Sequence, residues 1–324
     1  MKYLHVPDSK PRILPFYLAM EEYAARELQE DVFFAWQVEP TVIFGRHQVM
    51  GSEVDVDYCR RHGIAFYRRR SGGGCVYADR DNLMMSCVTQ SGEVEQVFAR
   101  YTARVVQMLR SLGLDATASQ RNDILIGGRK VSGNAFYQTG GRCIVHGTML
   151  FDTNMEHMLG ALTPPADKLK SKGVASVRSR ITTLREHLDI GLEAFKRHVR
   201  ETMCDGELRL SPEEVGKIEH LAQAYLDPQF LQGNDPHHMV EHARRIEGVG
   251  LLGVSLDLRH GRIADLRLTG DFLPLCDVRE AMLERLRGVR PEAKELGRAL
   301  EDCDAGRWIL NLGNRELISL LNYY

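Results

Sequence analysis

Apolar side chains recur at helical spacing near the N-terminus, over residues 16–29, where most residues are also good helix formers. This stretch predicts an amphipathic helix. Two β-rich runs at 32–38 and 41–44, separated by a Glu-Pro pair, predict two strands that pair with each other. A short helix at 57–62 and a strand at 64–69 follow. The first part of the chain therefore alternates between helix and sheet.

The same alternation continues through the middle of the chain. Strand-like runs at 75–77 and 83–89 precede a long helical pattern at 94–112, which a glycine ends. Residues 124–136 predict a hairpin, because two strand-like runs flank a Gly-Gly pair that can supply the positive φ angles of a two-residue turn. The run at 143–151 predicts a third strand beside this hairpin.

A change of pattern divides the chain in two. Residues 182–226 are mainly helical in pattern, whereas 226–242 contain the prolines, glycine and aspartates of a linker. A length of 324 residues suits two domains better than one. We therefore predict one domain over 1–245 and a second over 246–324, which contains two strands joined around His260 and two helices. The predicted fold class is α+β.

The composition, with 44% hydrophobic and 27% charged residues, is that of a soluble globular protein. No apolar run approaches the roughly 20 residues that cross a bilayer, and the N-terminus lacks the apolar core of a signal peptide. We therefore expect a cytoplasmic protein. The net charge of −2 gives no overall basic field for nucleic acid. Seven cysteines are scattered without the C-x-x-C spacing of zinc sites or redox dithiols.

Positive charge is concentrated in two stretches, and the first of them precedes three consecutive glycines. Arginines occur at 60, 61 and 68–70, and residues 71–77 then read Ser-Gly-Gly-Gly-Cys-Val-Tyr. Consecutive glycines let a backbone approach a ligand closely, and successive amides can converge on an anionic oxygen. Arginine forks suit phosphate or carboxylate. On these residues alone, a flexible surface turn with solvated arginines is the more frequent interpretation.

A lysine and a histidine on predicted strands are the next candidates. Period-2 alternation places Lys130, Ser132 and Asn134 on one face of the hairpin's second strand. A lysine fixed there can neutralise a phosphate or an acyl carboxylate, although an ordinary surface lysine is the commoner case for such a residue in isolation. His146 and Gly147 interrupt an apolar strand. Such a histidine is more often a hydrogen-bonded core residue than a catalyst.

Taken together and in this order, the segments resemble the lipoate-protein ligase A family, within the wider biotin/lipoate ligase and acyltransferase fold. The resemblance rests on residues 40–46, 68–77, 121–123, 129–133, 146–148, 162–164 and 172–180. It implies a large mixed-sheet catalytic domain of the biotin/lipoate ligase type. The part past residue 245 resembles the family's small C-terminal α+β accessory domain.

The resemblance implies an ATP-dependent reaction in two steps. Lipoate and ATP give lipoyl-AMP and pyrophosphate, and an acceptor lysine amine then displaces AMP. The implied cofactors are ATP and Mg²⁺, with lipoate as substrate. The implied acceptors are lipoyl domains of 2-oxoacid dehydrogenase acyltransferase subunits and the glycine cleavage H protein, without nucleic acid or membrane partners. Arginines 60, 61 and 68 and the lysines near 170 are candidates for steering such acidic domains.

The resemblance also implies residue roles. Lys130 would contact both the adenylate and the lipoyl carbonyl as the catalytic residue, while Arg69 and the backbone of 74–77 would hold phosphates. Asp123 is a candidate Mg²⁺ ligand. The acid-free stretch 168–180 corresponds to a loop that covers the adenylate. The predicted site comprises Arg69, Ser71, Gly72, Gly73, Gly74, Cys75, Val76, Tyr77, Asn122, Asp123, Lys130, Ser132, Gly133, His146, Gly147, Lys172 and Arg178.

The closest alternative is an octanoyl- or lipoyltransferase of the same fold, which uses a cysteine thioester and no ATP. No cysteine lies between Cys143 and Cys204, where the resemblance would place that nucleophile. An ATP-independent lipoyl carrier, a biotin-protein ligase and a non-catalytic protein that binds lipoyl domains are further alternatives. The preference between lipoate and octanoate depends on pocket depth rather than on a motif.

Overall fold

The computed structural model describes residues 1–90, 92–162, 179–233 and 242–322. It divides into two compact units. The first unit comprises residues 1–44, 50–69 and 75–232, and the second comprises 45–49, 70–74 and 233–324. The second unit therefore contains two short segments from the N-terminal part of the chain. The sequence-based domain boundary at residue 245 remains a prediction.

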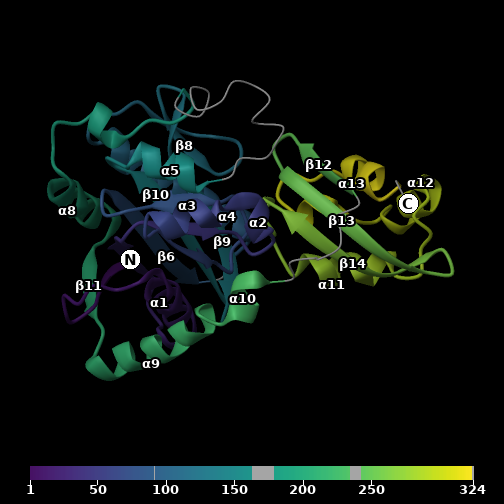
Figure 1. The fold of residues 1–324 in the computed structure, drawn as a ribbon, viewed down its shortest axis with the longest axis horizontal. Coiled ribbons are helices and arrows are strands. Elements are labelled where there is room, and N and C mark those ends of the chain that lie inside the picture. Colours follow the sequence, from purple (N-terminus) through teal and green to yellow (C-terminus); the bar gives the residue numbers. More distant parts are fainter. Residues whose placement is uncertain (91, 163–178, 234–241, 323–324) are drawn as a thin grey trace. The chain divides into compact units, whose positions relative to one another are not determined.

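An eight-stranded mixed sheet forms the centre of the first unit (Figure 1), with the strand order β11-β1-β2-β6-β10-β9-β8-β7. Only β1 pairs in parallel, with β2 and with β11, and the remaining neighbours are antiparallel. The strands are β1 (Lys2–His5), β2 (Val32–Trp36), β6 (Asn82–Gln90), β7 (Ala116–Ala118), β8 (Asp123–Ile126), β9 (Arg129–Thr139), β10 (Arg142–Leu150) and β11 (Gly206–Arg209).

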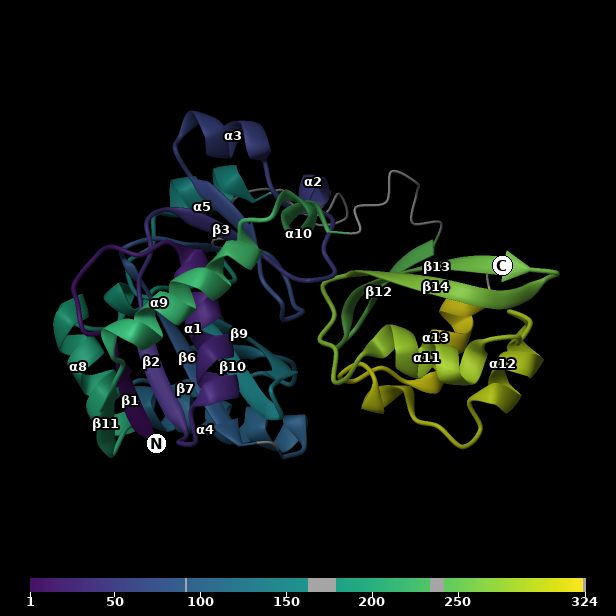
Figure 2. The ribbon, with the colours of Figure 1, turned by 90° about the horizontal axis from the view of Figure 1, so that it is seen from below.

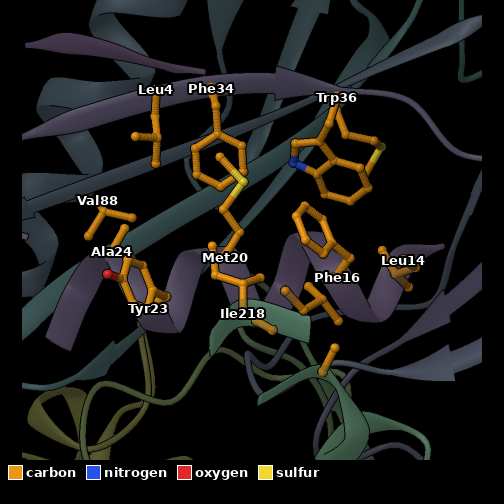
Figure 3. Close-up of a cluster of buried hydrophobic side chains, with 14 of the residues drawn as sticks. Leu4, Leu14, Phe16, Met20, Tyr23, Ala24, Phe34, Trp36, Val88 and Ile218 are labelled. Carbon is orange, nitrogen blue, oxygen red and sulfur yellow. The ribbon is translucent and has the colours of Figure 1, made fainter. Parts of the chain in front are cut away.

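Helices cover both faces of this sheet. α1 (Leu14–Glu27) packs on one face and is crossed by α9 (Pro212–Ala222), while α4 (Val94–Arg110) and α8 (Leu192–Met203) belong to the other (Figure 2). Alternate residues of β2 face α1, and Figure 3 shows the side chains of Phe34 and Trp36 pointing toward that helix. The predicted helices at 16–29 and 94–112 are therefore confirmed within two residues at each end.

A smaller sheet, with the order β4-β3-β5, lies in the same unit. The two strands predicted at 32–38 and 41–44 do form, but the prediction that they pair with each other is wrong. All four residues of β3 are buried, because β3 is a central strand with β4 and β5 on either side. The elements of this region are β3 (Thr41–Phe44), α2 (Met50–Glu53), α3 (Val56–Arg61), β4 (Ala65–Arg68), β5 (Val76–Ala78) and α5 (Met155–Ala161).

The predicted β8–β9 hairpin is confirmed, with φ angles of 56° at Gly127 and 77° at Gly128. The predicted strand at 143–151 is β10, which lies between β9 and β6. The described residues also contain three 3₁₀ turns, at Leu184–Glu186, Gln223–Tyr225 and Ala305–Arg307. None of the described helices is long and apolar enough to cross a bilayer.

The C-terminal part of the second unit is a three-stranded antiparallel sheet with helices on one face (Figure 2). The predicted turn is confirmed at His260 and Gly261, whose φ angles are 53° and 70°. The first strand and the last helix were not predicted. The elements are β12 (His242–Ile246), β13 (Gly250–Arg259), β14 (Arg262–Gly270), α11 (Val278–Leu286), α12 (Ala293–Ala299) and α13 (Asn314–Leu321).

A buried arginine from β4 caps the C-terminus of the helix α10 (Pro228–Gln232) in the first unit. Arg68 is only 4% exposed and donates hydrogen bonds to the carbonyls of Phe230, Leu231 and Gln232. A guanidinium at a helix C-terminus satisfies carbonyls that lack partners within the helix. Arg68 is thus a structural residue, and the expectation that it steers an acceptor from the surface is wrong.

Gly270 at the end of β14 provides a test of the second unit. Its φ is 132°, and a Cβ there would lie 2.0 Å from the carbonyl oxygen of Leu251. Gly270→Ala should therefore lower the free energy of unfolding of this unit by about 3 kcal/mol. Urea unfolding followed by the fluorescence of the buried Trp308, in a Trp36→Phe background, measures this change. Gly297→Ala, where a Cβ meets nothing within 4 Å, is the matched control.

Candidate functional site

Arg69 is buried at the end of strand β4, where the chain leaves the first unit. Its amide donates to the carbonyl of Phe44, and its Nη1 donates to the carbonyl of Ile43 at 3.0 Å. Burial lowers the pKa of this guanidinium to about 10, which still leaves it protonated at neutral pH. A fixed positive charge of this kind is suited to an anionic ligand.

Cys75, Val76 and Tyr77 follow on the other side of the glycines. Tyr77 is 2% exposed and belongs to the apolar cluster around β3, so its side chain is a core residue. Burial raises the pKa of its phenol. The predicted ligand contact through the backbone of 74–77 does not depend on this side chain.

The glycine-rich segment 71–74 belongs to the second unit. The amide of Gly73 donates to the carbonyl of Phe272 at 3.0 Å. A Cβ on Gly72 would lie 2.4 Å from Cδ of Pro274, so glycine is required there for close packing. Packing inside the second unit therefore accounts for Gly72, and a φ of 84° accounts for the glycine at 73. The Gly73 amide donates to Phe272 and is not available to a phosphate in this arrangement.

The β8–β9 hairpin holds the second group of predicted residues. Asn122 and Asn134 exchange side-chain hydrogen bonds, since each amide nitrogen donates to the other residue's carbonyl oxygen, at 2.7 and 3.0 Å. A Cβ on Gly147 of β10 would lie 2.0 Å from Oδ1 of Asn134. Gly147 is therefore a glycine because the neighbouring strand carries this asparagine, and Ser132 is fully buried beside it.

A β-bulge changes the face on which Lys130 lies. Ile124 pairs with Ser132 but Leu125 pairs with Lys130, so Val131 is an extra residue in β9. The alternation between Lys130 and Ser132 is thereby broken, and the prediction that they share a face is wrong. Bulges redirect side chains in this way, often beside active sites.

The redirected lysine points toward two other predicted residues. Its Nζ lies 2.7 Å from Oδ1 of Asp123. It also lies 2.7 Å from the position that a Cβ of Gly133 would occupy. The lysine side chain is about one third exposed, and its ammonium is paired with the carboxylate of Asp123.

The backbone of Lys130 is also fixed. Its amide donates to the carbonyl of Arg180, and its carbonyl accepts from the amide of Thr182, both at 2.8 Å. The last residue of the predicted adenylate loop, Arg180, and Thr182 just after it therefore pair with the backbone of the catalytic candidate. Lys172 and Arg178 of that loop lie outside the described residues.

His146 belongs to a buried polar network that sequence reasoning missed. Its Nδ1 lies 3.0 Å from both carboxylate oxygens of Glu21 on α1. Ser86 donates to Glu21 at 2.6 Å, and the indole of Trp36 donates to Ser86 at 2.9 Å. Glu21 is fully buried. The only sequence signal was a glutamate on the apolar face of the first helix.

Removing the carboxylate of Glu21 should destabilise the first unit strongly. Glu21→Ala leaves His146 and Ser86 without their common partner in a buried environment, which should lower the free energy of unfolding by about 3 kcal/mol. Urea unfolding measures the loss. Glu27→Ala, at an exposed position of the same helix, should change stability by less than about 0.5 kcal/mol. Equal effects of the two substitutions would contradict this account of the network.

Comparison with known proteins places these features in a family. Residues 15–204 match the lipoyl protein ligase A/B catalytic domain, and residues 235–321 match the bacterial lipoate protein ligase C-terminus. The chain is 33% identical to the lipoate-protein ligase LplJ of Bacillus subtilis, over 94% of this chain and 95% of the relative. It is 32% identical to lipoate-protein ligase 1 of Staphylococcus aureus, with the same coverage.

Solved structures agree with this assignment. A bipartite lipoate protein ligase from Thermoplasma acidophilum, studied with its E2 lipoyl domain, is 27% identical, with a TM-score of 0.63 over 74% of this chain and 98% of its own. A lipoate-protein ligase A bound with ATP is 26% identical, with a TM-score of 0.61 over 72% of this chain and 98% of its own.

The fold similarity extends over the whole chain. LipL1 of P. falciparum, solved with lipoate, has a TM-score of 0.77 over 99% of this chain and 98% of its own, at 16% identity. The α+β class, with a mixed-sheet domain of this family and a small C-terminal sheet domain, is therefore confirmed, as is the resemblance inferred from the sequence. The chain belongs to the lipoate-protein ligase family and is an enzyme of that class.

Proposed function

We propose that this protein is an ATP-dependent lipoate-protein ligase in which Lys130 is the catalytic residue. Family membership supports the reaction, and the position of Lys130 supports its role. Its side chain is carried by the β8–β9 hairpin and is one third exposed, and its ammonium is paired with one carboxylate. A preorganised charge of this kind stabilises negative charge that develops on a reacting group.

The reaction consists of two transfers. In the first, a carboxylate oxygen of lipoate attacks the α-phosphorus of ATP, and the bond to pyrophosphate breaks. In the second, the amine of an acceptor lysine attacks the acyl carbon of lipoyl-AMP, the bond to AMP breaks, and the amine loses a proton. Negative charge develops on the phosphate in the first step and on the acyl oxygen in the second. Lys130 is proposed to contact both positions.

Arg69 is the second proposed contact with the nucleotide phosphates, together with the backbone of 74–77. The buried guanidinium supports this role because a charge that burial already holds in place needs little further ordering to bind an anion. The basic loop with Lys172 and Arg178 is proposed to cover the adenylate and keep water from the mixed anhydride.

Magnesium is proposed to enter with ATP. Asp123 is the only carboxylate among the predicted site residues, and its Oδ1 is already paired with Lys130. Among the described residues, no group of three histidine, cysteine or acidic side chains is arranged to hold a metal ion. These residues do not form a resident metal site, which is consistent with an ion carried mainly by substrate phosphates and water.

The proposed acceptors are lipoyl domains of 2-oxoacid dehydrogenase acyltransferase subunits and the glycine cleavage H protein. A relative of this chain was studied with its E2 lipoyl domain, which supports the first of these. The exposed Arg60 and Arg61 remain candidates for attracting an acidic acceptor. The proposed location is the cytoplasm, where such acceptors and ATP occur together, without membrane or nucleic acid partners.

The chemistry of the cysteines disfavours the alternative transferase. A thioester route needs an activated thiolate. Complete or partial desolvation instead raises the pKa of the thiol in Cys59, Cys75, Cys87, Cys143, Cys204 and Cys276, of which Cys276 is the exposed one. At neutral pH these groups are less ionised than an ordinary thiol, so none is poised as a nucleophile.

Lys130→Ala should nearly abolish activation while leaving the fold intact. Lipoate-dependent exchange of labelled pyrophosphate into ATP should fall at least about 100-fold, because a fixed charge at the reacting phosphate is worth that much in comparable sites. Arg129→Ala, which removes a neighbouring exposed charge paired with Glu186, should retain most of the exchange. If the native protein shows no exchange but transfers lipoyl-AMP supplied from outside, it is a transferase only.

Alkylation of thiols should leave the reaction largely intact. Iodoacetamide at pH 7.5 should modify the exposed Cys276 before the buried cysteines, and more than half of the pyrophosphate exchange should survive. Mass spectrometry of the treated protein identifies the modified residues and proves that the reagent acted. Loss of transfer in parallel with alkylation of one cysteine, reproduced by its substitution with serine, would instead establish the thioester route.

A further inference from the structure

The side chain of Lys130 has a defined place that depends on three local features. The bulge at Val131 turns Lys130 away from the face of Ser132. Asp123 lies on the face that it turns toward, directly opposite Gly133 in the strand register. The lysine side chain therefore folds back over its own strand and lies above Gly133, which has no side chain.

Gly133 is essential to that geometry. A Cβ at this position would lie 2.7 Å from Nζ and 2.9 Å from Cε of Lys130. Both distances are shorter than any normal contact, so an alanine here would displace the end of the lysine. Gly133 does not have a positive φ angle, and its own backbone therefore accepts an alanine. The need for glycine comes from the lysine alone.

Asp123 is itself fixed before it meets the lysine. The backbone of Asp123 is hydrogen-bonded to Ser119 at both of its polar groups. Its amide donates to Oγ of Ser119 at 2.9 Å, and its carbonyl accepts from the Ser119 amide at 2.8 Å. Its Oδ1 is out of contact with solvent. The ammonium of Lys130 is the charge that compensates this oxygen. The pair is thus held from both strands of the hairpin.

We propose that Asp123 and Gly133 are positioning residues for Lys130, and that Asp123 serves this purpose rather than binding magnesium. In the protein without substrate, Asp123 holds the ammonium above Gly133. When lipoate and ATP bind, the developing acyl phosphate takes over as the partner of the ammonium. This inference rests on the proposed function, because the proposed function gives Lys130 the catalytic role that requires its side chain to be positioned.

The two roles of Asp123 compete physically. An ammonium 2.7 Å from a carboxylate oxygen neutralises most of its charge and would repel a divalent cation at the same group. A lysine without its partner has several rotatable bonds and samples many positions. Removing the carboxylate should therefore slow the chemical step, although it should not weaken the binding of anionic lipoate, for which Asp123 is a competitor.

The test compares Asp123→Asn and Gly133→Ala with the native protein. Gly216→Ala is the matched control for the glycine, because a Cβ there meets nothing within 4 Å. Three quantities are measured: the labelling rate of Lys130 by an amine-reactive ester without substrate, located by mass spectrometry; kcat and KM for lipoate in pyrophosphate exchange; and the Mg²⁺ concentration that gives half the maximal rate. Thermal unfolding establishes that each variant is folded.

Both variants should label Lys130 at least about threefold faster than the native protein. Both should lower kcat by about tenfold, and Asp123→Asn should leave KM for lipoate unchanged or lower. The Mg²⁺ requirement should not change, and Gly216→Ala should match the native protein in every measurement.

Two results would overturn the inference. Unchanged labelling and unchanged kcat in both folded variants would show that Lys130 needs no positioning. A tenfold higher Mg²⁺ requirement in Asp123→Asn, with unchanged labelling of Lys130, would assign Asp123 to the metal. If the native protein catalyses no exchange, the proposed function fails, whereas the labelling rates still test the positioning of the lysine.

Discussion

A fully buried carboxylate joins the main elements of the first unit. Glu21 of α1 lies between His146 of β10 and Ser86 of β6, and Ser86 in turn accepts the indole hydrogen of Trp36 on β2. A charge without solvent is tolerated only when its partners are in place. The network therefore fixes how α1 lies across three neighbouring strands. One of those strands, β10, also supports β9, which carries Lys130.

The larger elements of the fold could be predicted from the sequence because their patterns are long and local. The helix α4 and the β8–β9 hairpin each carry their own signal, in apolar spacing and in a Gly-Gly turn. Strand partners carry no such signal, and for that reason β2 and β3 were wrongly paired. The strand β7 and the helix α10 were not predicted, because with three and five residues they carry no clear periodic pattern of their own.

The candidate site was predicted in composition more accurately than in geometry. Lys130, Asp123 and Gly133 do lie together. The strand alternation nevertheless assigned Lys130 to the wrong face, because a bulge adds a residue without leaving a trace in the sequence pattern. The partner of His146 was missed for a different reason. Glu21 is distant in sequence, and only the packing of α1 brings the two together.

The glycine-rich segment is one of two short segments by which the N-terminal part of the chain enters the second unit. The path passes between the two units five times, since residues 45–49 and 70–74 belong to the second unit while their neighbours on both sides belong to the first. The second unit is thus joined to the first by five chain connections and not by a single linker. A polypeptide that stopped after residue 232 would still contain the glycines but would lack Phe272 and Pro274, against which Gly72 and Gly73 pack. Division of such a protein into two separate chains would therefore require the glycine segment to find its partner across a protein–protein interface.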